Sequence, residues 1–192
     1  LLSLSGMMLF ANVNNLAALF VVLEIISLPL YVLSAPARHR RLLSTEAALK
    51  SFILGAFASG FLLFGSAVIY GVYGVLDDSL LAKGMTRWAQ VGAPGLLVPV
   101  GVILIVVGLL FKIAAVPFHS WSPDVYQGAP TPVTGFMAAG VKAAAFLALV
   151  RFYYRIAGAM GWDLAPALWA VAALTMLVGT VVGVVQHDVK RM

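Results

Sequence analysis

The sequence contains no cysteine and few charged residues, and both absences narrow the class of protein. Without thiols, the chain itself can form no disulfide, iron–sulfur cluster or thiolate metal site. Charged residues make up 10% of its 192 residues and hydrophobic residues 62%, whereas about a quarter of the residues of a soluble domain are charged. So little polar surface cannot face water on all sides. The composition therefore predicts an all-α membrane protein, a polytopic helical bundle.

The three histidines also lack a metal-binding pattern. His39, His119 and His187 stand in separate regions, without the short spacing that places two ligands on one helix face. We therefore expect no metal ion and no cofactor in this chain. The net charge of +5 comes mostly from loops and helix ends, where it indicates membrane topology rather than nucleic-acid binding.

Apolar runs of the length that crosses a bilayer recur along the sequence. We predict a partial span at residues 1–11, full spans at 16–35, 46–73, 133–150 and 164–185, and a span at 94–121 that is broken near Pro117. Residues 77–92 are expected to form a polar loop. The sequence opens inside an apolar run without an initiator Met, so we interpret it as an internal piece of a longer membrane protein.

The run at 46–73 carries small residues at helical spacing. Ser51, Gly55 and Ser59 follow one another at intervals of four, and Ala56 and Gly60 repeat that interval. Small residues in such rows let a second helix approach closely in a membrane. We therefore expect this helix to be buried inside the bundle.

Three ionisable residues lie inside apolar spans, namely Glu24, Lys112 and Lys142. Each costs roughly 2.5–3.5 kcal/mol at the centre of a membrane helix on insertion scales. Glu24 and Lys142 are each about 13 Å of helix from either end of their spans, too far to reach the interface. These side chains must therefore face the bundle interior and meet each other, water or freed backbone.

Pro117 follows Lys112 by five residues. Proline has no N–H for the carbonyl four residues earlier, and its ring clashes there. We expect the helix to kink or unwind just after Lys112, leaving open carbonyls and room for water beside the lysine. A nearby glutamate such as Glu24 would then switch Lys112 between holding and releasing a proton.

Other polar residues have a simpler interpretation beside the functional one. The three intramembrane charges could form a static buried pair that fixes helix register. Lys50 could extend to the interface, and His119 could be an interfacial histidine as readily as a proton relay. We interpret Asp124 and Tyr126 mainly as polar anchors of the break region.

Residues 112–133, KIAAVPFHSWSPDVYQGAPTPV, resemble the signature of the subunit N family of proton-pumping NADH–quinone oxidoreductases. Residues 23–30 (LEIISLPL) and 46–65 (EAALKSFILGAFASGFLLFG) are similar to that family as well. Subunits L and M and the Mrp-type cation/proton antiporters are more distant relatives. They share the lysine–proline–histidine–Trp-x-Pro-Asp frame, whereas Val125-Tyr126-Gln127-Gly128 is typical of the N type.

The resemblance implies a fragment of an antiporter-like inverted-repeat fold with a proline-broken helix. It also implies proton translocation through Glu24, Lys112 and Lys142, with Lys50 and His119 as candidate further relay groups. The redox chemistry would lie elsewhere, with NADH, FMN, iron–sulfur clusters and quinone bound by partner subunits in a bacterial inner membrane. Two alternatives stay open: an Mrp-type antiporter subunit without a redox partner, and a structural membrane scaffold with a static ion pair.

Overall fold

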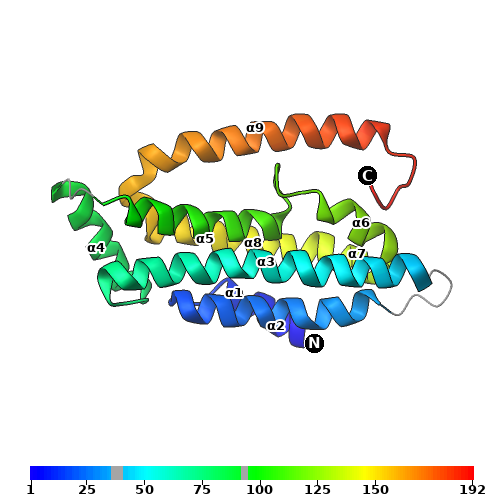
Figure 1. Cartoon of the computed structure of the whole chain (residues 1–192), viewed down its shortest axis with the longest axis horizontal. Helices are drawn as coiled ribbons and strands as arrows, with labels where there is room; N and C mark the ends of the chain where they lie inside the picture. Colours follow the sequence, from blue (N-terminus) through cyan, green and yellow to red (C-terminus); the bar gives the residue numbers. More distant parts are fainter. Residues whose placement is uncertain (36–40, 92–94) are drawn as a thin grey trace.

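The computed structural model describes residues 1–35, 41–91 and 95–192, and these residues form helices joined by short connections (Figure 1). The helices in chain order are α1 (Leu2–Phe10), α2 (Leu16–Ser34), α3 (Arg41–Tyr73), α4 (Asp78–Val91), α5 (Leu97–Ile113), α6 (Trp121–Gly128), α7 (Thr131–Phe136), α8 (Lys142–Arg155) and α9 (Gly161–Val185). A π-helical turn, Met137–Val141, joins α7 to α8, and a 3-10 turn, Ala157–Met160, precedes α9. The described residues contain no β-strand. The chain is therefore an all-α bundle.

Four helical segments in the described part of the chain are long and apolar enough to cross a bilayer. They are Leu16–Ser34, Leu42–Tyr73, Thr131–Arg155 and Leu164–Val185, and the shorter apolar helix Leu97–Ile113 accompanies them. The segment Thr131–Arg155 passes from α7 through the π-helical turn into α8 without interruption, and so it extends beyond the predicted 133–150 at both ends. The protein is a multi-pass membrane protein.

Helix α3 runs through the middle of the bundle, between α2 and α5 (Figure 1). Glycines make the contact between α3 and α5 close: a Cβ on Gly65 would lie 2.7 Å from the Gly101 carbonyl oxygen. A Cβ on Gly108 would lie 2.9 Å from the Leu62 Cβ. Close approach of two backbones through small residues is how membrane helices gain packing contacts without a hydrophobic driving force.

Helix α9 lies apart from this tight packing, along the other side of α5 and α8 (Figure 1). From residue 165 to its end, every residue of α9 is at least partly exposed. One polar tether holds its middle to the bundle, since the Val116 amide donates to Thr175 Oγ1 at 3.0 Å. The side of α9 away from the bundle is therefore apolar and uncovered.

The prediction of a polar loop at residues 77–92 is wrong, because Asp78–Val91 is the helix α4. The Asp77 carboxylate accepts hydrogen bonds from the amides of Ser79 and Leu80, as an N-cap residue does. Leu81 and Met85, four residues apart, are fully buried. A cap and one short apolar stripe are enough to fix an otherwise polar helix.

Within the span predicted at 94–121, the helix α5 ends just after Lys112, where we expected the helix to kink or unwind. Helix α5 begins at Leu97 and ends at Ile113, one residue after Lys112. The chain then turns through residues 114–120 before α6 begins at Trp121. The helix ends here because Pro117 leaves no amide for the Ile113 carbonyl and disfavours helical geometry in the residue before it.

Candidate functional site

The end of α5 places Lys112 in the last helical turn, directly before an unusual backbone conformation. Ala114 has φ 62° and ψ 41°, in the left-handed region that residues with a Cβ rarely adopt. Such a conformation costs on the order of 1–2 kcal/mol for a residue other than glycine. Strain of this kind is found preferentially at functional sites. The conformation of Ala114 therefore destabilises the fold locally at the point where α5 ends beside the lysine.

Two carbonyls in the last turn of α5, those of Leu110 and Phe111, have protein donors from beyond the break. The indole Nε1 of Trp121 donates to the Phe111 carbonyl at 3.0 Å. The Ala115 amide donates to the Leu110 carbonyl at 3.1 Å. Trp121 therefore holds the start of α6 against the end of α5. The hydrogen-bond partner of the lysine lies on another helix.

Lys112 reaches across to α2. Its Nζ donates to Ser27 Oγ at 2.5 Å and lies 5.9 Å from the centroid of the Tyr31 ring. Ser27 is fully buried and donates in turn to the Leu23 carbonyl at 2.5 Å. The lysine thus has one hydroxyl acceptor and one aromatic face, and both come from the same side of α2.

Glu24 stands one helical turn before Ser27 on α2, but it does not contact Lys112. Within the described part of the chain, no hydrogen bond or ion pair joins the Glu24 carboxylate to the lysine. The carboxylate is half-buried. The structure therefore places Ser27 at Lys112, with Glu24 one turn away.

Two small cavities adjoin the Lys112 side chain. One, of about 20 Å³, is also lined by Ser27 and Tyr126; the other, of about 30 Å³, is also lined by Tyr31 and Ser51. A cavity above about 10–15 Å³ can hold one water molecule if polar groups line it. The Tyr31 hydroxyl is buried without a hydrogen-bond partner among the described residues. The surroundings of Lys112 therefore suit one or two bound waters.

Lys142 lies in a separate and much larger cavity of about 520 Å³. Its Nζ is 5.3 Å from the centroid of the Tyr126 ring, within the range of a cation–π contact. His119 lines the same cavity, and its buried Nδ1 has no partner among the described residues. The π-helical turn Met137–Val141 ends directly before Lys142, and such turns often occur at functional sites.

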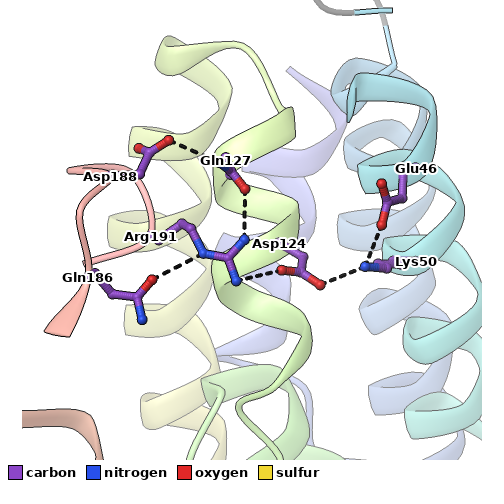
Figure 2. A network of polar contacts seen from close by, with 7 residues as sticks. All are labelled: Glu46, Lys50, Asp124, Gln127, Gln186, Asp188 and Arg191. Atoms are coloured by element: carbon purple, nitrogen blue, oxygen red, sulfur yellow. Dashed lines mark hydrogen bonds and ion pairs between the residues drawn. The ribbon is translucent and has the colours of Figure 1, made fainter. Parts of the chain in front are cut away.

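Lys50 belongs to a different polar group, the charged network shown in Figure 2. Its Nζ lies 2.6 Å from both Glu46 and Asp124. On the other side of Asp124, the Arg191 guanidinium lies 2.9 Å from the carboxylate and donates to Gln127 at 2.7 Å. Lys50 is therefore held in ion pairs with Glu46 and Asp124 and belongs to a different polar group from Lys112. The network joins α3, α6 and the segment after α9.

The hydrogen bond from Lys50 holds the pKa of the Asp124 carboxyl below its usual value. Partial burial opposes this effect, and the positive charges of Lys50 and Arg191 reinforce it. Asp124 is therefore ionised at neutral pH. It serves as the acceptor at the centre of the network.

A second polar cluster lies where the α1–α2 connection meets α4 and α8. Arg151 donates to the Ala11 carbonyl at 2.7 Å, and Arg155 donates to Asn14 at 2.9 Å. Burial raises the pKa of Asp78 above its usual value, while the charges of Arg151 and Arg155 lower it. These contacts tie the ends of helices together and do not touch the intramembrane lysines.

Sequence reasoning singled out Lys112 but missed three side chains that surround it. Ser27, Tyr31 and Trp121 carry no charge, so insertion cost did not single them out. A signal was present for two of them, because Ser27 and Tyr31 lie three and seven residues after Glu24, on one face of a helix. Among the residues that the structure describes, no three His, Cys, Asp or Glu side chains group as metal ligands; His39 lies outside those residues.

The broken end of α5 carries one lysine, and a second lysine follows a π-helical turn in a separate cavity. Broken helices beside ionisable groups are typical of membrane transporters. The sequence profile described as NADH:quinone oxidoreductase/Mrp antiporter, transmembrane, matches residues 13–192. The chain belongs to this family.

Relatives and solved structures agree with this assignment. The chain is 56% identical over 191 residues to NADH-quinone oxidoreductase subunit N of Beutenbergia cavernae, covering 100% of this chain and 35% of that protein. It resembles a chain of respiratory complex I from Thermus thermophilus with a TM-score of 0.77 at 44% identity, covering 97% of this chain and 38% of that one. For the Mrp complex from a Dietzia species, the TM-score is 0.67 at 28% identity, covering 80% and 27%. The chain spans about a third of the length of the curated relatives it matches.

Proposed function

We propose that this chain forms the proton-uptake part of a membrane subunit of NADH–quinone oxidoreductase, with Lys112 as its central proton carrier. One observation carries the proposal: Lys112 sits at the broken end of α5, bonded to the Ser27 hydroxyl and flanked by two water-sized cavities. An ammonium group held by a hydroxyl and an aromatic ring, without a carboxylate in contact, can release its proton to water.

In this mechanism Glu24 acts on Lys112 through space. A carboxylate one turn away from Ser27 favours the protonated lysine, and loss or displacement of that negative charge favours proton release. The proton then passes towards Lys142, whose cavity also holds His119 as a further candidate acceptor. Pro117 contributes by ending α5 beside the lysine. Lys50 is a weaker candidate for a relay group, since its ion pairs with Glu46 and Asp124 hold it away from Lys112.

The relatives supply the setting of the proposal. Quinone reduction in other subunits of the complex would drive the change at Glu24, with NADH, FMN and iron–sulfur clusters bound in those subunits. Partner subunits and lipid would cover the apolar outer faces. The protein would reside in a bacterial inner membrane, because the named relatives are bacterial. This chain would be a non-redox part of an oxidoreductase.

The experiment compares Lys112→Ala with Lys83→Ala in the full-length protein within its native membranes. Lys83 is an exposed lysine of α4 and serves as the matched control. Proton uptake into inverted vesicles is followed together with NADH oxidation. We expect Lys112→Ala to reduce proton uptake to about a hundredth of the control, since a positioned proton carrier contributes roughly that factor or more. Undiminished uptake would contradict the proposal.

An antiporter subunit without a redox partner is the second candidate, and the likeness to the Dietzia Mrp complex favours it. It predicts cation-dependent proton exchange in vesicles that contain neither NADH nor quinone. The scaffold alternative depends on a static pair of Glu24 and Lys112. The lack of direct contact between these two side chains weighs against that pair. It would regain support if the double variant Glu24→Gln, Lys112→Gln pumped at the wild-type rate.

A further inference from the structure

Tyr126 lies between the two lysines and has no role in the proposed function described so far. The cavity of about 20 Å³ beside Lys112 and the cavity of about 520 Å³ that contains Lys142 are separate spaces. Among the residues that the structure describes, Tyr126 alone lines both. Tyr126 therefore lies at the boundary between the two spaces.

The ring of Tyr126 also makes a specific contact on each side. Lys142 Nζ lies 5.3 Å from the ring centroid. Trp121, which caps the broken end of α5, packs edge-on against the ring, with centroids 6.3 Å apart and planes at 77°. The ring thus connects the residue that holds the helix break to the second lysine.

The backbone of Tyr126 is held equally firmly. Its carbonyl oxygen accepts a hydrogen bond from Thr134 Oγ1 at 3.0 Å, and the same hydroxyl lies 3.3 Å from the Pro130 carbonyl. Thr134 belongs to α7, which leads into the π-helical turn before Lys142. The segment that carries Tyr126 is therefore fixed against the helix that carries Lys142.

We propose that the aromatic ring of Tyr126 is a positioning residue for proton transfer: it separates the Lys112 and Lys142 cavities and seats the Lys142 ammonium on its face. This inference rests on the proposed function, because it assigns the step between the two lysines. A cation–π contact favours the charged lysine, and so the ring stabilises Lys142 when it has received the proton. The same ring keeps the small cavity beside Lys112 from merging with the large cavity of Lys142.

Three substitutions of Tyr126 distinguish the effect of the aromatic ring from the effects of the hydroxyl group and of side-chain volume. Tyr126→Phe keeps the ring, Tyr126→Leu removes it, and Tyr126→Met replaces it with a flexible side chain that fills irregular space. Tyr154→Leu is the matched control, because Tyr154 lies on α8, the helix of Lys142, and is 76% exposed. All variants are made in the full-length protein in its native membranes. NADH-driven proton uptake per NADH oxidised and assembly on native gels are measured for each.

We expect Tyr126→Phe and Tyr154→Leu to keep wild-type uptake per NADH. We expect Tyr126→Leu and Tyr126→Met to assemble and to lose about fivefold to thirtyfold of the uptake per NADH, the range between an exposed and a desolvated cation–π contact. Wild-type uptake in the Leu and Met variants would overturn the inference, and so would loss in the Phe variant. Failure of both ringless variants to assemble would also overturn it, in favour of a purely structural ring.

The outcomes keep this inference apart from the proposed function. If Lys112→Ala and Lys142→Ala abolish uptake while the ringless variants pump normally, only the role of Tyr126 is wrong. If Lys112→Ala pumps normally, the proposed function fails first, and the assignment of Tyr126 fails with it.

Discussion

At the scale of single residues, Lys112 depends on uncharged partners. Its ammonium group has a hydroxyl acceptor on Ser27 at 2.5 Å and the face of Tyr31 at 5.9 Å. Counting the charges in apolar spans predicted that these side chains meet each other, water or freed backbone. In the structure Lys112 meets the hydroxyl of a serine. A neutral acceptor holds the lysine without fixing its charge, which suits a group that must gain and lose a proton.

Replacing Ser27 tests this arrangement. In Ser27→Ala the buried ammonium loses its hydrogen-bond acceptor, which costs on the order of 1–3 kcal/mol for a charged group. We expect proton uptake per NADH to fall by about tenfold, because a shift of 1.4 kcal/mol changes an equilibrium tenfold. Uptake into inverted vesicles measures the change.

Ser34→Ala is the matched control for this substitution. Ser34 is also a fully buried serine of α2, and its hydroxyl donates to the Leu30 carbonyl at 2.8 Å without contacting a lysine. It should pump normally. Equal loss in both variants would show that buried serines of α2 matter for packing alone.

At the scale of helices, the length of the apolar runs predicted the apolar segments. The helix-capping residues between those runs were not recognised in the sequence. Residues 77–92 contain enough polar side chains to suggest a loop, yet Asp77 caps a helix and Leu81 and Met85 anchor it. The break region around Asp124 and Tyr126 likewise forms a short helix, α6. The π-helical turn before Lys142 was not predicted, because such turns are rare and no local pattern in the sequence marks this one.

The rows of small residues on α3 show the same limit. Ser51 and Ser59 are buried as expected. Ala56 and Gly60 are exposed instead, and nothing lies within 4 Å of a Cβ placed on Gly60. Spacing alone predicted both rows, but the side of α3 that carries Ala56 and Gly60 is exposed in the described part of the chain.

This difference gives a matched pair of glycine substitutions. Gly65→Ala would place a methyl 2.7 Å from the Gly101 carbonyl and 2.9 Å from Ile105, so α3 and α5 must separate. We expect the free energy of unfolding to fall by about 1–3 kcal/mol, the usual cost of overpacking. Gly60→Ala meets no atom and should stabilise the helix by about 0.5–1 kcal/mol.

Thermal unfolding in detergent micelles measures both variants. The two substitutions add the same methyl group to the same helix, and so their difference isolates the contact with α5. Equal stability of the two variants would mean that the close contact of Gly65 with Gly101 does not set the distance between α3 and α5.

At the scale of the whole molecule, polar contacts gather in two clusters away from the two intramembrane lysines. Arg151 and Arg155 tie α8 to the α1–α2 connection. The charged network of Figure 2 ties α3 and α6 to the segment that follows α9. Lys190 adds to that attachment, since its ammonium donates to the carbonyls of Gln127 and Ala129. The sequence showed these charges as interface residues but not which ones pair, because the pairs join positions 61 to 141 residues apart.

The pH dependence of stability follows from Asp124 at the centre of that network. Its pKa is held below the usual value mainly by the hydrogen bond from Lys50. A carboxyl whose folded pKa is depressed contributes stability above its unfolded pKa of about 3.9, and that stability is lost as the pH falls through the folded pKa. Asp124→Asn should therefore lower stability at pH 7 by about 1 kcal/mol, the upper range for a partly exposed ion pair. The difference from the unmodified protein should shrink below about pH 4.

Melting temperatures in detergent at pH 7 and pH 3.5 test this expectation, with Glu46→Gln as the control. Glu46 pairs with Lys50 four residues along α3 and is 54% exposed, so its loss should cost at most about 0.5 kcal/mol. Arg191→Gln should reproduce part of the Asp124→Asn effect at pH 7, because the guanidinium holds the other side of the same carboxylate. A loss in Asp124→Asn that is the same at both pH values would indicate that the carboxylate acts through packing, and that its charge does not hold α6 to α3.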